Sequence, residues 1–441
     1  MKRNLSFTVL LFFVAFQGAA QANLLQSGPM VGYSTMREVE LWVQTKGAAT
    51  VFYHFWDVND SATIYESDFA QTAKEDYFTA KIKVGPLEPG KHYRYQLFIN
   101  GQLEERPYPL EFQTQTLWQW RSDPPEFDFA FGSCLYINDE KYDRPNNKYG
   151  GQYEIINSIY AKHPDFMVWD GDNTYLREAD WNSETGIAYR YTRDRSLPEM
   201  QSLLGSVHNY AIWDDHDFGP NDSDKRYWNK EITEKVFNDF WANPNTNQTG
   251  KGGITGTFQW ADCQFFLLDD RWFRSPDNYT GSDKVMFGEV QLNWLLDVLE
   301  YSQAPFKFVV TGGQILNPAS IYETYATFPE ERQKLLDEIA TREIKGVIFL
   351  TGDRHLTELT KLERSGTYPL YDLTVSPLTS GPNTNRNEGN TLQVPGTLLN
   401  ERNFAILHVS GKRTDRVLDI NTFSVSGEER WHYQIKASDL R

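Results

Sequence analysis

The rhythm of apolar residues changes at residues 121–125, and this change restricts the fold more than any other feature of the chain. From about Leu24 to Trp120, aromatic and β-branched residues alternate with polar ones, and turn-forming pairs such as Pro89-Gly90 recur at short intervals. Such alternation is typical of short antiparallel strands. We therefore predict a β-sandwich domain over residues 23–120, followed by a hinge at residues 121–125.

Five strands are expected within this sandwich, at residues 39–45, 49–57, 77–84, 91–101 and 108–116. The segment 85–90 reads GPLEPG and leads to Tyr93 and Tyr95, which resembles a fibronectin or immunoglobulin-like module. The resemblance implies that the module supports the rest of the chain.

After the hinge, apolar strands alternate with segments of helical periodicity. Six strands are expected first, at residues 127–133, 165–169, 210–213, 258–268, 306–311 and 347–351. Two helices are indicated by apolar stripes at Leu292, Leu295, Leu296 and Leu299 and at Leu335, Leu336 and Ile339. Strands return at residues 371–375, 404–409, 417–425 and 431–435. We predict an α/β (α+β) domain over residues 126–441, with mixed sheets flanked by helices.

The charge of the chain excludes several classes of partner. It has 43 Lys and Arg residues against 60 Asp and Glu residues, a formal net charge of -17. Nucleic-acid backbones and anionic lipid surfaces attract basic patches, so we expect no specific nucleic-acid binding. A small anionic substrate is still compatible with this charge, because bound cations reverse the local field.

The N-terminus has the layout of a cleaved signal peptide. Lys2 and Arg3 precede an apolar run at residues 5–16, and Ala20-Gln21-Ala22 follows. The run is shorter than the roughly 20 apolar residues that a membrane-spanning helix needs. We therefore predict a signal peptide at residues 1–22, a secreted or periplasmic location, and no stable membrane insertion.

Polar and ionisable residues gather where the six predicted strands end, which is the edge of such sheets where ligands bind. They are Ser133 and Cys134; Asp170, Asp172 and Tyr175; Asp214, Asp215, His216, Asp217 and Asn221; Asp269, Asp270 and Arg271; Gln314; and Asp353, Arg354 and His355. One acid after a strand is most often a helix cap or a turn residue. A cluster of acids, however, repels itself unless cations neutralise it.

The types of side chain in this cluster indicate two kinds of ion. Carboxylate and amide oxygens suit hard cations such as Ca²⁺, Mg²⁺ or Mn²⁺, whereas thiolate, phenolate and imidazole suit a transition metal. Because both sets are present, we predict a two-metal centre that activates water for attack on a phosphate ester, with Asp172 as the bridging carboxylate.

Five motifs carry a resemblance to a known family: GSC at 132–134, WDGDNTY at 169–175, WDDHDFGPND at 213–222, LDDRWFR at 268–274 and LTGDRH at 350–355. Together they resemble the PhoD-type alkaline phosphatases of the calcineurin-like metallophosphoesterase superfamily. The resemblance implies a centre of Fe³⁺ and Ca²⁺, with Zn, Mn or Mg as alternatives. It implies these ligands: Cys134 and Tyr175 on the iron, Asp172 between the ions, Asn221 on the second ion, and Asp353 and His355 closing the site.

Several of these residues have a second interpretation. Cys134 is either a ligand or half of a disulfide with Cys263, and we favour the ligand because Cys263 lies within an apolar strand. Tyr175 is either a phenolate ligand or an aromatic lid. We expect His216 beside the substrate, where it protonates the leaving group or orients water, rather than in the core.

Arginine suits phosphate because its guanidinium group forms a bidentate fork. We expect Arg271 to bind the substrate and to act in catalysis, with Arg190, Arg193 and Arg354 as further candidates. Ion pairing with protein carboxylates is the alternative for each of them. Gln314 is equally compatible with contact to the second ion and with a structural role.

We predict a phosphoric ester hydrolase that acts on small phosphomonoesters, phosphodiesters or both. One alternative is a phospholipase D-like phosphodiesterase on the same centre, and another is a non-catalytic secreted Ca²⁺-binding or adhesion protein. Cys134, Tyr175 and His355 argue against the last, because structural Ca²⁺ sites use oxygen ligands. Residues 383–396 are rich in Asn, Thr and Gly, and a long loop is expected there.

Overall fold

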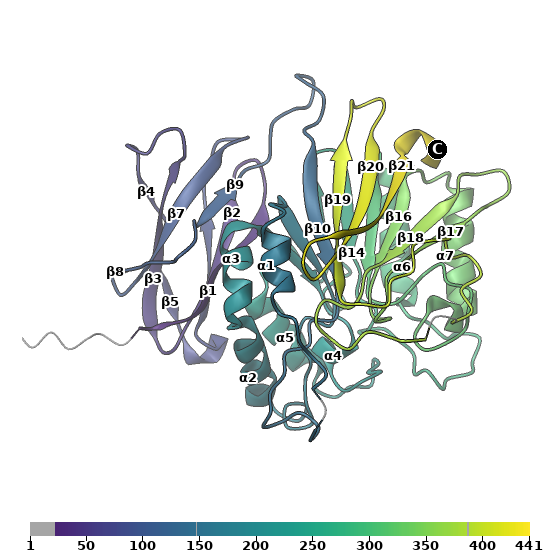
Figure 1. The fold of residues 1–441 in the computed structure, drawn as a ribbon, viewed down its shortest axis with the longest axis horizontal. Coiled ribbons are helices and arrows are strands. Elements are labelled where there is room, and N and C mark those ends of the chain that lie inside the picture. Colours follow the sequence, from purple (N-terminus) through teal and green to yellow (C-terminus); the bar gives the residue numbers. More distant parts are fainter. Residues whose placement is uncertain (1–22, 147, 386–387) are drawn as a thin grey trace, which may run out of the picture.

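The N-terminal strands form one end of an elongated molecule, and two larger sheets with their helices form the rest (Figure 1). This computed structural model describes residues 23–146, 148–385 and 388–441. The predicted signal peptide at residues 1–22 lies outside the described residues. None of the helices in the described residues combines the length and the apolar character that crossing a bilayer requires.

The N-terminal region folds into strands, as its alternating pattern predicts. They are β1 (Leu25–Ser34), β2 (Val39–Thr45), β3 (Ala49–Asp57), β4 (Tyr65–Glu66), β5 (Ala70–Thr72), β6 (Thr79–Val84), β7 (His92–Ile99), β8 (Gln102–Glu104) and β9 (Glu111–Gln113). One sheet has the order β4-β3-β7-β8, with β5 paired to β3 and β9 to β7. β1, β2 and β6 form the opposite layer, and a separate apolar core lies between the two layers.

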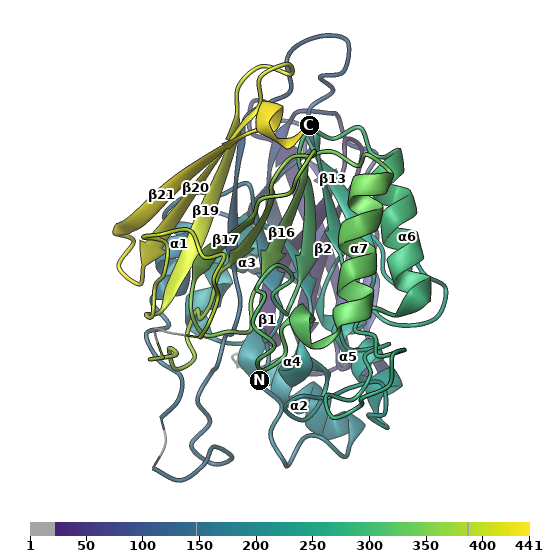
Figure 2. The same cartoon turned by 90° about the vertical axis from the view of Figure 1, so that its right-hand side faces the viewer.

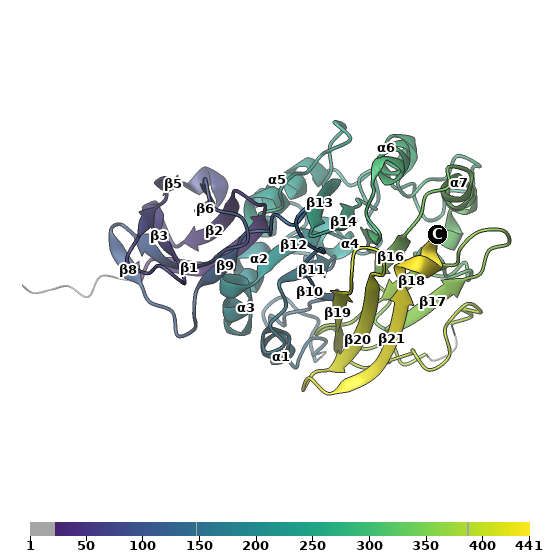
Figure 3. The ribbon, with the colours of Figure 1, turned by 90° about the horizontal axis from the view of Figure 1, so that it is seen from above.

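This sandwich shares a sheet with the rest of the chain. β1 pairs in parallel with β12 (His208–Ile212), with Val31 opposite His208. β1, β2 and β6 therefore extend a nine-stranded sheet of order β21-β20-β19-β10-β11-β12-β1-β2-β6, and Figure 3 shows this continuity from above. The predicted hinge at residues 121–125 connects β9 to β10 but does not separate two independent sheets.

The larger part of the chain contains two sheets packed face to face. Its remaining strands are β10 (Phe127–Gly132), β11 (Phe166–Asp170), β13 (Gly256–Trp260), β14 (Cys263–Leu267), β15 (Lys307–Thr311), β16 (Val347–Thr351), β17 (Glu358–Leu362), β18 (Leu370–Thr374), β19 (Asn403–Ser410), β20 (Val417–Ser424) and β21 (Glu429–Lys436). The second sheet has the order β13-β14-β15-β16-β18-β17. Phe129 of β10 meets Phe265 of β14 and Phe308 of β15 edge to face, with ring centroids 5.2 and 5.3 Å apart. Strands buried on both faces in this way form nearly continuous apolar runs.

Helices cover the outer faces of both sheets. They are α1 (Ile155–Tyr160), α2 (Glu184–Arg195), α3 (Gln201–Ser206), α4 (Asp215–Phe218), α5 (Lys230–Phe240), α6 (Gly288–Tyr301) and α7 (Pro329–Thr341). α6 and α7 lie side by side along the six-stranded sheet (Figure 2). Both predicted apolar stripes are buried in these two helices. The predicted class, mixed sheets flanked by helices, is confirmed.

Several stretches differ from the prediction, among them the additional strands β4, β5 and β17. The single strand expected at residues 258–268 is a hairpin of β13 and β14, which turns at Ala261 and Asp262. Ala261 has a φ of 49°, a conformation that Gly or Asn usually marks, so the sequence carries no turn signal there. β1 is an additional strand without alternation, because it is buried along almost its whole length.

Candidate metal centre

The candidate ligands lie together at the carboxyl edge of the two sheets. β10, β11 and β12 run parallel in one sheet, and β14, β15 and β16 run parallel in the other. Cys134 follows β10, Asp172 follows β11 and His355 follows β16. The six strand ends that the sequence singles out are thus brought to one edge.

Three groups of side chains are close enough to hold metal ions, with ligand atoms within 4.8 Å of one another. The groups are Cys134, Asp172 and His355; Asp172, Asp215 and His216; and Asp215, Asp222 and Glu323. Asp172 belongs to the first two groups and Asp215 to the last two. The groups are therefore adjacent, and each shared carboxylate has an oxygen for each of two neighbouring ions.

Four residues of this edge have left-handed backbone conformations. The φ angles are 63° at Cys134, 53° at Asp172, 61° at Asp353 and 54° at His355. Residues other than glycine seldom adopt such angles, and strained backbone concentrates at functional sites. The turns after β10, β11 and β16 thus hold these side chains in directions that a relaxed strand end would not give.

Cys134 is a buried, free thiol at the centre of the first group. Its Sγ atom lies 3.7 Å from Asp172 Oδ2 and accepts a hydrogen bond of 3.0 Å from Ser376 Oγ. Burial raises the pKa of this thiol well above its usual value, and the negative charge of Asp172 adds to the shift. Cys263 is also free and buried, so the alternative of a disulfide between the two cysteines does not occur in this structure.

His355 and Tyr175 complete the surroundings of this group. His355 Nε2 lies 3.3 Å from Tyr175 Oη and 3.2 Å from Ser380 Oγ. The Tyr175 ring also contacts His216, with centroids 4.3 Å apart. The phenol, the imidazole and the thiol are thus close neighbours, and these donors suit a transition-metal ion.

Several acids of the centre form no ion pair within the described residues, unlike Glu323, which pairs with Arg271. Burial, and then the charge of Asp215, raises the pKa of Asp172 well above its usual range. Burial also raises the pKa of Asp215 to about 7 and the pKa of Asp353 to about 6. Both carboxylate oxygens of Asp170 are buried without a hydrogen-bond partner in the described residues. This donor set fits bound cations, which would offset the repulsion among the acids.

Two further acids of the motifs have structural roles. Asp217 accepts hydrogen bonds from the backbone N–H groups of Asn173, Thr174 and Asp214, and so ties the turn after β11 to α4. Asp269 accepts from the Trp213 indole and from three backbone N–H groups. Their oxygens are engaged in positioning the loops that carry the ligands.

His216 is the second residue of α4 and belongs to the second ligand group. Burial lowers the pKa of His216 to about 3. The ring is therefore neutral at neutral pH and lacks the additional proton that a general acid gives up. A neutral, buried imidazole has a free lone pair, which suits a metal ligand or the acceptor of a hydrogen bond from water.

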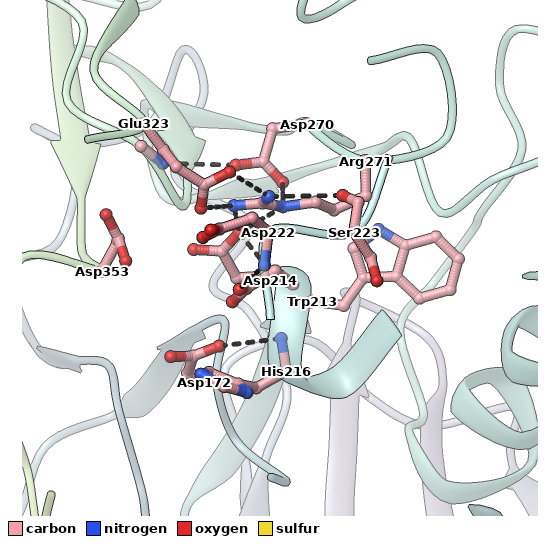
Figure 4. Close-up of polar contacts among 12 residues, drawn as sticks. Asp172, Trp213, Asp214, His216, Asp222, Ser223, Asp270, Arg271, Glu323 and Asp353 are labelled. Carbon is pink, nitrogen blue, oxygen red and sulfur yellow. Dashed lines mark hydrogen bonds and ion pairs between the residues drawn. The ribbon is translucent and has the colours of Figure 1, made fainter. Parts of the chain in front are cut away.

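Arg271 lies in a buried network of ion pairs (Figure 4). Its guanidinium is fully buried, and it pairs with Asp214 and, at 2.7 Å, with Glu323. Arg274 pairs with the same Glu323 carboxylate at 2.7 Å. Since protein carboxylates occupy its fork, Arg271 holds the acids of the site in place and presents no free fork to a phosphate.

Arg190 and Arg193 likewise pair with acids, away from the ligand groups. Arg190 is fully buried between Asp139, at 3.1 Å, and Asp180, at 2.8 Å. Arg193 contacts Asp139 and Asp194, both at 3.1 Å. Both arginines therefore form ion pairs with protein carboxylates, which is the alternative that the sequence left open.

Arg354 pairs with Glu388 and lies 4.2 Å from the centroid of the Tyr322 ring. Gln314 donates to Glu358 at 2.8 Å and to Thr374 at 2.9 Å, which places its amide in a buried polar network. Asn221 is exposed, and its side chain makes no hydrogen bond within the described ranges. The adjacent Asp222 belongs to a ligand group of acidic side chains, and Asn221 stays a predicted ligand of the second ion.

Glu323 and Asp222 are members of the third group that motif reasoning missed. Glu323 lies in the segment between β15 and α7, far from any strand end. No spacing signal in the sequence identifies it. Asp222 is the last residue of the motif at 213–222 that also contains Asp215, and its backbone N–H donates to Asp215 Oδ2 at 2.6 Å. Its place in that motif was the only signal.

Two family descriptions match the chain. Residues 129–418 match the PhoD-like phosphatase family, and residues 22–117 match a domain of unknown function. No curated protein matches the sequence.

Two solved structures share the fold over most of the chain. The structure of PhoD aligns with a TM-score of 0.75 and 17% sequence identity, over 96% of this chain and 92% of that chain. A purple acid phosphatase from yellow lupin (Lupinus luteus) seeds aligns with a TM-score of 0.68 and 11% identity, over 93% of this chain and 74% of that chain. At these identities the likeness shows the fold alone.

Proposed function

This chain belongs to the PhoD-like phosphatase family, and we propose that it is an exported hydrolase that acts on phosphomonoesters, phosphodiesters or both at a centre of at least two metal ions. The observation that carries the proposal is the chain of ligand groups joined by Asp172 and Asp215. A phosphoester hydrolase needs cations beside a polarised phosphate, and this edge of the sheets has the donors to hold them.

The donors divide by chemical type along this chain. Cys134, His355 and the neighbouring Tyr175 supply sulfur, nitrogen and phenol, which favour a transition metal such as Fe³⁺. Asp215, Asp222 and Glu323 supply oxygen alone, which favours Ca²⁺ or a related hard cation. Asp172 lies between these sets and keeps its proposed role as a bridge. Asp353, adjacent to His355, supplies a further carboxylate.

When bound, the ions polarise phosphoryl oxygens and lower the pKa of water. The chain itself positions these ligands through Asp217, Asp269 and Arg271, each fixed by buried hydrogen bonds or ion pairs. His216 is the residue that we propose orients the reacting water, because its ring is neutral and belongs to the second group. Arg354, which follows Asp353 and has a buried Nε without a partner in the described residues, becomes our candidate for a phosphate contact.

The proposal is tested by metal analysis together with rates on an aryl phosphomonoester and its bis-aryl diester. We expect the purified protein to contain a transition metal and a second cation, and to hydrolyse at least one of the two esters. A chelator should abolish the activity, and added metal should restore it.

The control is Asp68→Asn, which changes an exposed acid of the N-terminal sandwich and should leave the rates unchanged. Protein that binds calcium alone and hydrolyses neither ester would show that the proposal is wrong. That result would favour the non-catalytic Ca²⁺-binding alternative.

A further inference from the structure

Tyr149 lies on the loop between β10 and α1, and its hydroxyl group contacts the candidate ligand His355. Tyr149 Oη is 2.8 Å from His355 Nδ1. The other ring nitrogen, Nε2, faces Tyr175 Oη and Ser380 Oγ at 3.3 and 3.2 Å. The two nitrogens therefore have different surroundings: Nδ1 is engaged by Tyr149, and Nε2 lies on the side of the first ligand group.

The loop that carries Tyr149 is fastened to the segment before α2 by buried ion pairs. Arg177 binds Asp143 Oδ1 through Nη2 at 2.8 Å and through Nε at 3.0 Å. The second oxygen of Asp143 accepts from the Asp139 backbone N–H at 2.6 Å. Asp139 in turn pairs with Arg190. Arg190, which the sequence suggested for substrate binding, thus helps to hold this loop in place.

The Tyr149 residue itself is also held from two sides. Arg402 Nη2 donates to the Tyr149 backbone carbonyl at 3.1 Å. The Tyr149 ring packs over Gly381, where an added Cβ would lie 2.9 Å from Tyr149 Cε2. Tyr136 packs edge to face against it, with centroids 5.0 Å apart. The hydroxyl is therefore presented to His355 by a fixed ring.

A neutral imidazole has one N–H and one lone pair, and the partner of one nitrogen decides which nitrogen carries the proton. Metal-binding histidines usually donate the free N–H to an oxygen, which fixes the ring and its tautomer. We propose that Tyr149 is a positioning residue for His355: its hydroxyl oxygen accepts the Nδ1–H and leaves the Nε2 lone pair for a metal ion. This inference rests on the proposed function.

The first test measures metal affinity in Tyr149→Phe, which removes only the hydroxyl oxygen. Zinc is the probe, and its dissociation constant is obtained by competition with a chromophoric chelator. We expect binding to weaken about 10- to 100-fold, the usual effect of losing such a partner. Ester hydrolysis should fall at limiting zinc and return to within about threefold of the wild-type kcat at saturating zinc, because the loss lies in metal affinity.

Tyr142→Phe is the matched control, since Tyr142 lies on the same loop but packs on Tyr189 and not on His355. Its zinc affinity should equal that of the wild type. Equal affinities in Tyr149→Phe and wild type would overturn the inference while leaving the proposed function intact. A wild-type protein that binds no metal would overturn both.

The second test reads the tautomer directly, which a merely structural role of Tyr149 would not change. In zinc-loaded protein with ¹⁵N-labelled histidine, the wild type should show a protected Nδ1–H resonance that is absent from His355→Asn. In Tyr149→Phe this proton should exchange faster with solvent. An Nε2–H tautomer of His355 in the wild type would contradict the proposal.

Discussion

Around α2, buried acids are matched by arginines, whereas four of the buried acids at the strand ends are not. Asp139, Asp143, Asp180 and Asp194 each lie within ion-pair distance of Arg177, Arg190 or Arg193. At the strand ends, Asp170, Asp172, Asp215 and Asp353 form no ion pair within the described residues. Both groups are buried in one fold. The difference teaches that arginines neutralise most of the charge of the first group, which stabilises loops, whereas the second group fits our proposal of bound metal ions.

The largest effect is expected when the unmatched group loses its shared carboxylate. Asp172→Asn should reduce ester hydrolysis by about 1,000-fold or more, because both ligand groups that contain Asp172 lose a charge. In a chelator, the same variant should unfold at a higher denaturant concentration than the wild type. The reason is that an amide removes one negative charge from among unpaired acids.

Rates and denaturant midpoints of both proteins, with and without chelator, check this prediction. A lower midpoint for Asp172→Asn in chelator would mean that the carboxylate is already neutralised by the protein. The two groups of acids would then not differ in the way that we infer.

The matched group should respond with the opposite sign. Arg190→Met leaves Asp139 and Asp180 buried without this partner, and breaking such a buried pair costs about 3–5 kcal/mol. We expect the free energy of unfolding to fall by this amount at neutral pH, with chelator or without. Denaturant unfolding monitored by tryptophan fluorescence measures it, and an unchanged midpoint would show that ions, not Arg190, neutralise these acids.

A third way of burying an ionisable group is found at His208, between the sandwich and β11. Its Nδ1 lies 2.7 Å from the Gly32 carbonyl oxygen, and its Nε2 accepts from the Gln113 backbone N–H at 3.1 Å. Burial lowers the pKa of His208 to about 4. The unfolded chain therefore binds a proton at this histidine more tightly than the folded chain does. As a result, the free energy of unfolding is highest above about pH 6.5 and decreases as the pH falls toward 4.

The expected loss over this pH range is about 3 kcal/mol. His208→Asn should lose most of this pH dependence, which unfolding curves at pH 4.5, 5.5 and 7 would show. The same slope in both proteins would assign the effect to other groups.

The smallest effect is expected at Arg193, whose side chain is 29% exposed. Arg193→Met should lower the free energy of unfolding by less than Arg190→Met does, because Arg193 is partly exposed to water and Asp139 keeps Arg190 as a partner. The KM for an aryl phosphate should also stay within about twofold of the wild type. A tenfold rise in KM with unchanged stability would instead favour the substrate-binding role that the sequence suggested for Arg193.

Much of the fold follows from short-range signals. The apolar stripe of α6 and the buried runs of β10 and β11 are periodic patterns that read the same in the chain and in the structure. The hairpin at Ala261 escapes such reasoning because an alanine turns the chain without a glycine or asparagine to mark it. The pairing of β1 with β12 escapes it because the two strands lie far apart in the sequence.

For the site, the sequence points to the residues that directly follow strands, since parallel strands end at one edge. Cys134, Asp172 and His355 come together for this reason. Glu323 and Tyr149 arrive on loops, and only tertiary packing decides where a loop ends. The partners of an arginine are equally long-range: Arg190 meets Asp139, which is 51 residues away.

The sheet shared between the two regions gives the N-terminal sandwich a protective role. The strand β12 has β11 on one side and β1 on the other. Without the first hundred or so residues, β12 would become a bare sheet edge, with a row of unpaired N–H and C=O groups available to any other extended chain. The sandwich therefore covers this edge of β12 and moves the end of the shared sheet away from the candidate metal centre, to β6.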